Sequence, residues 1–168
     1  MMIKIGKDIS KFSYYSCQPK TAKELKVIIG TRISKDGPRC NLNDIDTSLI
    51  TDMGWLFDGS EFNGDISEWN VSRVKHMPYM FLNSDFNGDI SRWNISNVES
   101  MEGMFERSKF NGDISDWNVS KVKDMPYIFA LSSFNRDISN WNISKDCDTY
   151  NMFAGTLIKK QFKPKLPS

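Results

Sequence analysis

The chain has 168 residues and a net charge of +1, and 39% of its residues are hydrophobic, 12% aromatic and 26% charged. This length suits one domain, and the apolar content is too high for a disordered chain. No apolar run approaches the roughly 18 residues that cross a membrane, and the charged start of the chain does not resemble a secretory signal peptide. The three cysteines lack a Cys-x-x-Cys spacing, which favours reduced thiols in a cytoplasm over a disulfide framework or a zinc site.

The net charge conceals basic ends around an acidic body. Residues 1–37 carry a net charge of +5 and residues 155–168 carry +4, whereas residues 38–154 carry −8. An asymmetry of this kind concerns partners and solubility rather than the fold.

A helix is the first element that we predict. Thr21 and Glu24 have the spacing of a capping box, and apolar residues follow at positions 25, 28, 29 and 33, on one helical face. Gly37 and Pro38 then end the helix. We therefore predict that residues 1–37 form an N-terminal extension and a capping helix.

A repeat of 24 residues follows, and it dominates the sequence. The motif Phe-Asn-Gly-Asp-Ile-Ser-x-Trp-Asn begins at Phe62 and returns without insertion at Phe86, at Phe110 and, with Arg in place of Gly, at Phe134. A degenerate copy precedes them. The repeat predicts five coils and a basic C-terminal tail, over residues 38–61, 62–85, 86–109, 110–133, 134–157 and 158–168.

We predict a short strand and a short helix in each coil. Trp69 and Val71 alternate around a polar residue, as in a strand, whereas Met77, Met80 and Phe81 have the spacing of a helical turn. No coil can bury its apolar face alone, so equivalent residues must stack in columns. The predicted fold class is a right-handed α/β solenoid with leucine-rich-repeat-like coils, parallel strands on one face and short helices on the other.

The coil pattern D-I-S-x-W-N-[VI]-S-x-V-x-x-M-x-x-M-F, with Phe-Asn-Gly at its boundary, resembles the BspA-type leucine-rich repeats of bacterial surface lipoproteins and of some phage and mobile-element proteins. The lead-in from Lys23 to Leu25 and the segment 42–48 also match that family. The resemblance covers roughly residues 19–157. It implies a leucine-rich-repeat solenoid with an interaction role, often adhesion, and it carries no catalytic residues.

Two polar columns recur in the coils. One column holds the carboxylates Asp65, Asp89, Asp113 and Asp137, and the other holds Asn70, Asn94, Asn118 and Asn142. Stacked carboxylates attract a hard cation such as calcium, but an Asx-turn within each coil also explains them and is favoured. The stacked amides are expected to bond from coil to coil as structural ladders, with a ligand-binding surface as the alternative.

The candidate partner-binding residues differ from coil to coil. They are Trp55, Tyr79 and Tyr127, the charged column Glu68, Arg92 and Asp116, and Arg73 and Lys121 of a basic strip. The charged column is expected to form ion pairs between coils, and the aromatic side chains either meet a partner or lie flat over neighbouring coils. The strip also contains Lys75, Lys123 and Lys145, with Glu99 among them. A solvated surface is favoured there over a nucleic-acid site because the array is acidic.

The sequence contains no catalytic motif, and we expect no enzyme activity, no cofactor and no metal centre. We predict a protein–protein interaction module that binds a macromolecular partner, in the cytoplasm, as a phage- or mobile-element-encoded inhibitor of a host defence or nucleic-acid enzyme. The alternative is a bacterial surface adhesin whose export signal is missing from this chain. Nucleic acid and a membrane span are not expected, and the protein is expected to be a monomer or to associate weakly end to end.

Overall fold

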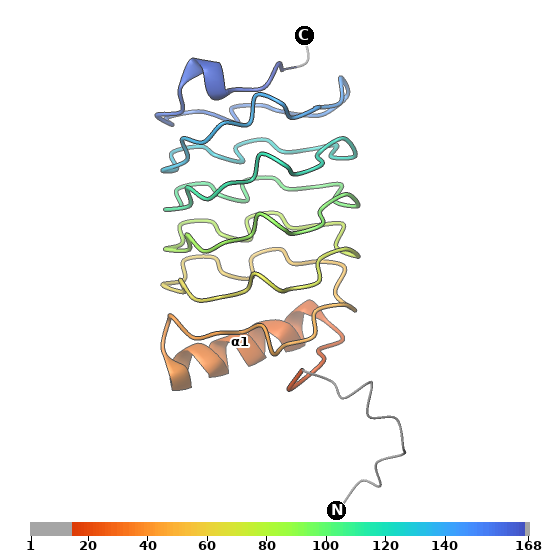
Figure 1. The fold of residues 1–168 in the computed structure, drawn as a ribbon, viewed down its shortest axis with the longest axis vertical. Coiled ribbons are helices and arrows are strands. Elements are labelled where there is room, and N and C mark those ends of the chain that lie inside the picture. Colours follow the sequence, from red (N-terminus) through yellow and green to blue (C-terminus); the bar gives the residue numbers. More distant parts are fainter. Residues whose placement is uncertain (1–14, 167–168) are drawn as a thin grey trace, which may run out of the picture.

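The structure is a computed structural model, and it describes residues 15–166. The chain winds into a stack of similar coils, with α1 (Ala22–Asp36) lying across the end next to the first coil (Figure 1). The short 3-10 helix η2 (Lys160–Phe162) lies at the opposite end. The first 14 residues of the predicted N-terminal extension, and the last two of the tail, fall outside the described residues.

The helix predicted from the capping box is confirmed. The Thr21 side chain accepts a hydrogen bond from the Glu24 N–H over 3.2 Å, and the N–H of Gly37, at a left-handed φ of 86°, donates to the Ile33 carbonyl. Leu25 and Ile29 are buried against the first coil. Within the described residues, neither α1 nor any other helix is long and apolar enough to cross a membrane.

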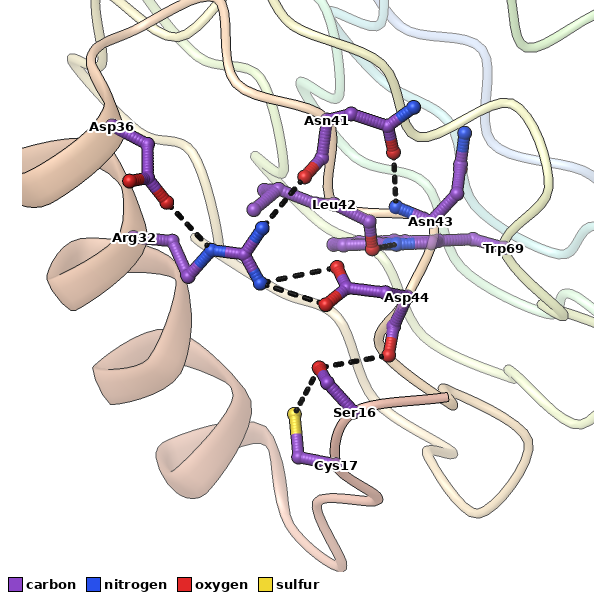
Figure 2. A network of polar contacts seen from close by, with 9 residues as sticks. All are labelled: Ser16, Cys17, Arg32, Asp36, Asn41, Leu42, Asn43, Asp44 and Trp69. Atoms are coloured by element: carbon purple, nitrogen blue, oxygen red, sulfur yellow. Dashed lines mark hydrogen bonds and ion pairs between the residues drawn. The ribbon is translucent and has the colours of Figure 1, made fainter. Parts of the chain in front are cut away.

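A polar network joins α1 to the first coil (Figure 2). Arg32 Nη1 lies 2.9 Å from Asp44 Oδ2, and Arg32 Nη2 donates to the Asn41 carbonyl over 3.0 Å. Arg32 Nε also lies 3.0 Å from Asp36 Oδ2, on the same helix. The segment before the helix contributes as well, because the Ser16 N–H donates to the Asp44 carbonyl over 2.6 Å. These contacts hold the helix in one place relative to the stack.

The predicted α/β solenoid is wrong, because the coils contain no helices and no sheet. Among residues 15–166, α1 is the one α-helix, and the β pairing consists of isolated parallel bridges. The segment predicted as a strand is a pair of β-turns: the Trp69 N–H donates to the Ile66 carbonyl over 3.2 Å, and the Val74 N–H to the Val71 carbonyl over 2.9 Å. The apparent alternation around Asn70 marks the place where the two turns meet.

The predicted helical turn is replaced by a ladder. Tyr79 and Tyr127, two residues after the methionine of their coils, have left-handed φ angles of 54° and 57°. A left-handed residue interrupts an α-helix. Alternate backbone N–H groups point to the next coil instead, as when Met77 donates to the Ser100 carbonyl over 3.0 Å and Tyr79 to the Glu102 carbonyl over 2.7 Å.

Equivalent residues lie directly above one another in the core. The rings of Trp69 and Trp93 are 6.4 Å apart and 4° from parallel, and the rings of Phe86 and Phe110 are 6.2 Å apart and 2° from parallel. All four side chains are buried. The 24-residue register of the repeat is therefore the register of the stack.

Candidate functional site

A groove of about 1090 Å³ runs along the stack from Thr51 to Asp146. Its central side chains are two sets of three that come from equivalent positions of successive coils. They are Arg73, Asn97 and Lys121, which we name the amide column, and Lys75, Glu99 and Lys123, which we name the carboxylate column. The groove therefore carries four cations and, at its centre, one carboxylate.

The amide column stands on stacked β-turns. Arg73 is a central residue of the turn closed by Val71 and Val74, whose side chains are buried. Asn97 and Lys121 hold the same position in the next two turns, where the closing hydrogen bonds measure 2.8 and 3.0 Å. Because the apolar residues that close these turns are buried in the core, the residues between them project into the groove.

The carboxylate column is joined through the backbone as well as through its side chains. The Glu99 N–H donates to the Lys75 carbonyl, and the Lys123 N–H to the Glu99 carbonyl, each over 2.8 Å. Glu99 Oε1 lies 3.4 Å from Lys75 Nζ, and Glu99 Oε2 lies 2.5 Å from Lys123 Nζ. The hydrogen bond and charge of Lys123, with those of Lys75, lower the pKa of Glu99, so its carboxylate stays ionised.

The amide column also has two cations, Arg73 and Lys121, but it has no carboxylate. Lys121 Nζ donates to Asn97 Oδ1 over 2.9 Å, and Asn97 Nδ2 donates to the Ser72 carbonyl over 2.9 Å. Arg73 is exposed and makes neither a hydrogen bond nor an ion pair with any residue from 15 to 166. The charge at this position of the groove is therefore uncompensated.

The predicted ion ladder of Glu68, Arg92 and Asp116 is wrong. All three residues are exposed, but within the described chain neither Glu68 nor Asp116 lies within 4.0 Å of Arg92 as an ion pair. Coil-to-coil ion pairs occur elsewhere, as between Lys109 Nζ and Asp85 Oδ1 at 2.7 Å. Of the eight nominated residues, Arg73 and Lys121 line the groove, and the other six do not.

The outward aromatic side chains lie over neighbouring coils. Trp55, which is 45% exposed, stacks on Tyr79 with ring centroids 4.3 Å apart. The Tyr79 ring in turn covers Gly103, where an added Cβ would collide with the ring. Tyr127 is half-buried and contacts Tyr150 edge to face at 5.5 Å. The structure thus shows one of the two alternatives for these residues, packing over neighbouring coils.

The aspartate column forms turns. Asp65 Oδ1 accepts the Ser67 N–H over 3.0 Å, and Asp89 Oδ1 accepts the Ser91 N–H over 2.9 Å. These hydrogen bonds lower the pKa of Asp65 and of Asp89. No group of three or more metal-ligating side chains is found among residues 15–166. The column therefore has the geometry of Asx-turns.

The predicted coil-to-coil ladder of Asn70 and its equivalents is wrong, because Asn70 Oδ1 accepts the Ser72 N–H of its own coil over 3.1 Å. A different asparagine forms the ladder. Asn63 Oδ1 accepts the Asn87 N–H over 2.9 Å, and Asn87 Oδ1 accepts the Asn111 N–H over 2.7 Å. The Phe-Asn pair that opens each repeat is the sequence signal for this ladder.

All three cysteines are free, and Cys40 and Cys147 are buried. Burial raises the pKa of Cys147 to about 11. The thiol is therefore protonated at neutral pH and packs as an apolar side chain.

The model of a family described as "Mycoplasma protein of unknown function, DUF285" matches residues 33–130 and 106–165. The chain belongs to this family. The two matches overlap and together cover the whole stack of coils. No curated protein and no solved structure matches the chain. The resemblance to BspA-type repeats stays a prediction.

Proposed function

We propose that this member of the DUF285 family is a non-enzymatic binding module that holds a protein partner in the groove. The observation that carries the proposal is the pair of cations Arg73 and Lys121, neither of which has an ion-pair partner among residues 15–166. Arg is among the residues that contribute most to protein interfaces when a partner desolvates it.

The rigidity of the groove supports this role. The carboxylate column is linked from coil to coil by backbone hydrogen bonds of 2.8 Å, and the amide column stands on turns closed by buried valines and an isoleucine. A surface that is ordered before binding loses little conformational entropy on association. Stacked repeats in general present binding surfaces of this kind.

The charge distribution favours a protein over a nucleic acid. Residues 38–154 carry a net charge of −8, which repels a polyanion at long range. The groove itself also holds Glu99 and Asp146. A protein can place one acidic side chain against the cations and neutral side chains elsewhere, which a nucleic-acid backbone cannot do.

Two predictions remain for where the protein acts in the cell. One is a cytoplasmic inhibitor of a host defence or nucleic-acid enzyme, and the other is an adhesin of the cell surface. Fractionation of the producing cells separates them, because recovery from the cytosol alone contradicts the adhesin.

A charge-reversal experiment tests the groove. The double variant Arg73→Glu/Lys121→Glu reverses both cations of the amide column, and the control Arg39→Glu/Lys160→Glu makes the same change in net charge at exposed residues outside the groove. Tagged proteins are incubated with lysate of the producing cells, with and without nuclease treatment, and the bound proteins are identified by mass spectrometry. Circular dichroism establishes that both variants are folded.

We expect one or more proteins to bind the wild type and the control at equal levels and to be lost from the groove variant. Equal loss from both variants would mean that general charge governs binding, and it would contradict the proposal. Retention by the groove variant would place the binding surface elsewhere. If nuclease treatment abolishes binding, the groove binds a nucleic acid, and the proposal of a protein partner is wrong.

A further inference from the structure

We propose that the amide column is a binding site for one carboxylate, supplied by an Asp or Glu side chain of an extended segment of the partner protein. This inference rests on the proposed function and specifies what the groove recognises. Its basis is the comparison of two columns that stand side by side in the same three coils. One column contains its carboxylate, and the other does not.

The carboxylate column shows how the coils bind a carboxylate. Glu99, in the middle coil, is reached by Lys75 from the coil before at 3.4 Å and by Lys123 from the coil after at 2.5 Å. Glu99 is partly covered, with 30% of its side chain exposed. Two cations, one coil below and one coil above, therefore lie within ion-pair distance of a carboxylate between them.

The amide column repeats this arrangement with a neutral centre. Arg73 lies one coil before Asn97 and Lys121 one coil after, so the same two steps along the stack separate the cations. Asn97 is held in place by its bonds to the Ser72 carbonyl and to Lys121. A carboxylate that enters above Asn97 meets both cations, as Glu99 does in the neighbouring column.

The cations of the amide column are available for this contact. Arg73 forms no hydrogen bond or ion pair with the described residues, and its planar guanidinium suits bidentate contact with a carboxylate. Lys121 bonds to a neutral amide oxygen at 2.9 Å, and a charged acceptor makes a stronger hydrogen bond than a neutral one. An incoming carboxylate therefore gains two charged contacts and displaces at most one neutral contact.

The other acidic groups of the groove restrict the ligand. Glu99 stands beside the proposed site and Asp146 lies further along the groove, so closely spaced negative charges are repelled on both sides. A segment with one acidic residue among neutral ones fits these charges, whereas a run of phosphates or of consecutive carboxylates does not.

Asn97→Asp tests the site because it supplies from within the chain the carboxylate that the partner would bring. Asn140→Asp makes the same change in charge at an exposed residue outside the groove. The probes are a nine-residue peptide of glycine and serine with blocked ends and one central glutamate, the same blocked peptide with glutamine, and a ten-residue oligothymidylate. Binding is followed by the amide NMR signals of residues 72–75, 96–99 and 120–123.

We expect the glutamate peptide to shift these signals with an affinity about tenfold higher than that of the glutamine peptide, because two cations contact its carboxylate. Asn97→Asp should remove this difference, and Asn140→Asp should leave it unchanged. Arg73→Gln is the second variant, for the case in which Asn97→Asp perturbs the turn, and it should reduce the difference to about threefold or less.

Four results overturn the inference: no binding of either peptide at millimolar concentration, equal binding of the two peptides, equal effects of Asn97→Asp and Asn140→Asp, or preference for the oligothymidylate. The proposed function can fail separately. If the lysate partner depends on Arg73 and Lys121 but the two peptides bind equally, the groove binds a protein by contacts other than the carboxylate. If the peptides differ as expected but no lysate protein depends on the groove, the site binds carboxylates and the proposed partner is wrong.

Discussion

The two walls of the stack are built in different ways, although every coil contributes to both. We name residues 62–74 and their equivalents the turn wall, and residues 77–83 and their equivalents the ladder wall. The turn wall has nearly the same sequence in each coil, whereas the ladder wall varies: 77–83 reads MPYMFLN, 101–107 reads MEGMFER and 125–131 reads MPYIFAL. The kind of hydrogen bond that joins the coils explains this difference.

In the ladder wall, backbone groups join the coils. The N–H groups of Gly103 and Arg107 donate to the carbonyls of Pro126 and Ala130 over 2.9 and 2.8 Å. A backbone donor is present whatever side chain the residue carries, proline excepted. The outward side chains of this wall are therefore free to differ between coils, and Glu106 is replaced by an alanine one coil later.

In the turn wall, side chains join the coils. Asn87 Oδ1 accepts the Asn111 N–H over 2.7 Å, and Trp117 Nε1 donates to the Ile90 carbonyl over 3.2 Å. Each of these bonds needs one kind of side chain, and the next coil needs the same one. Repetition of the sequence is thus strongest where the side chains, and not the backbone, carry the contacts between coils.

The largest expected effect comes from cutting the asparagine ladder. Asn111→Ala removes the acceptor of the half-buried Asn135 N–H, which now lies 2.9 Å from Asn111 Oδ1. An unpaired backbone donor of this kind costs about 1–2 kcal/mol in the free energy of unfolding. Urea denaturation at neutral pH measures the change.

Glu106→Ala is the matched control in the ladder wall of the same coil. The Glu106 N–H keeps its bond to the Gly103 carbonyl, and the substitution removes the ion pair with Arg107 at 3.6 Å. We expect a change within about 0.5 kcal/mol. Equal losses for the two alanine variants would contradict the distinction between the walls.

The sequence predicted the helix and the register but not the path of the chain within a coil. Thr21 and Gly37 mark the ends of α1 through local hydrogen bonds, which depend on a few neighbouring residues. The 24-residue step between Trp69 and Trp93 follows from repetition alone. The spacing of Met77, Met80 and Phe81 fits a helical turn, but coil-to-coil backbone bonds prevail and place Tyr79 at a left-handed φ of 54°.

The sequence predicted which charged residues recur in the coils, but not which of them face one another. Arg73, Lys121 and the strip around Glu99 were visible in the sequence as charges at equal spacing. Which outward column faces a neighbour depends on turn geometry, and Glu68 and Arg92 proved not to form the ion pair expected of them. Opposite charges at equivalent positions therefore do not establish a contact unless the direction of the side chains is known.

A smaller effect concerns the aspartates of the turn wall. Hydrogen bonds from the backbone of Ser67, Ser91 and Ser115 lower the pKa of Asp65, Asp89 and Asp113 in the folded protein. A folded pKa below the unfolded value means that the stabilisation is present above the unfolded pKa, near pH 4, and is lost as the pH falls through the folded pKa. Unfolding should therefore become easier below about pH 4.

Asparagine in place of these three aspartates accepts the same N–H without titrating. The triple variant should be somewhat less stable at pH 7, because a neutral acceptor is weaker, and its free energy of unfolding should fall less steeply between pH 5 and pH 3. The same neutralisation at three exposed carboxylates outside these turns is the control: Asp58→Asn, Glu61→Gln and Asp116→Asn. Urea denaturation across this pH range should give a flatter curve for the turn variant than for the control.

The smallest expected effect lies in the ladder wall, at Leu131. Leu131 has a left-handed φ of 57° and is 52% exposed, and glycine occupies the equivalent position in the next coil, as Gly155. A left-handed backbone costs a residue with a Cβ about 1–2 kcal/mol, and glycine avoids this cost but loses more backbone entropy on folding. Leu131→Gly should therefore be more stable than Leu131→Ala by about 0.5 kcal/mol.

The opposite order is expected at Ser133, two residues further along the same coil. Ser133 is exposed and does not have a left-handed backbone, so Ser133→Gly should be less stable than Ser133→Ala by about 0.5–1 kcal/mol. Thermal denaturation of the four variants measures both differences. If the glycine variant were less stable than the alanine variant at both positions, left-handed residues would add no strain to the ladder wall. The coil-to-coil bonds would then hold Leu131 in this conformation without a backbone penalty to overcome.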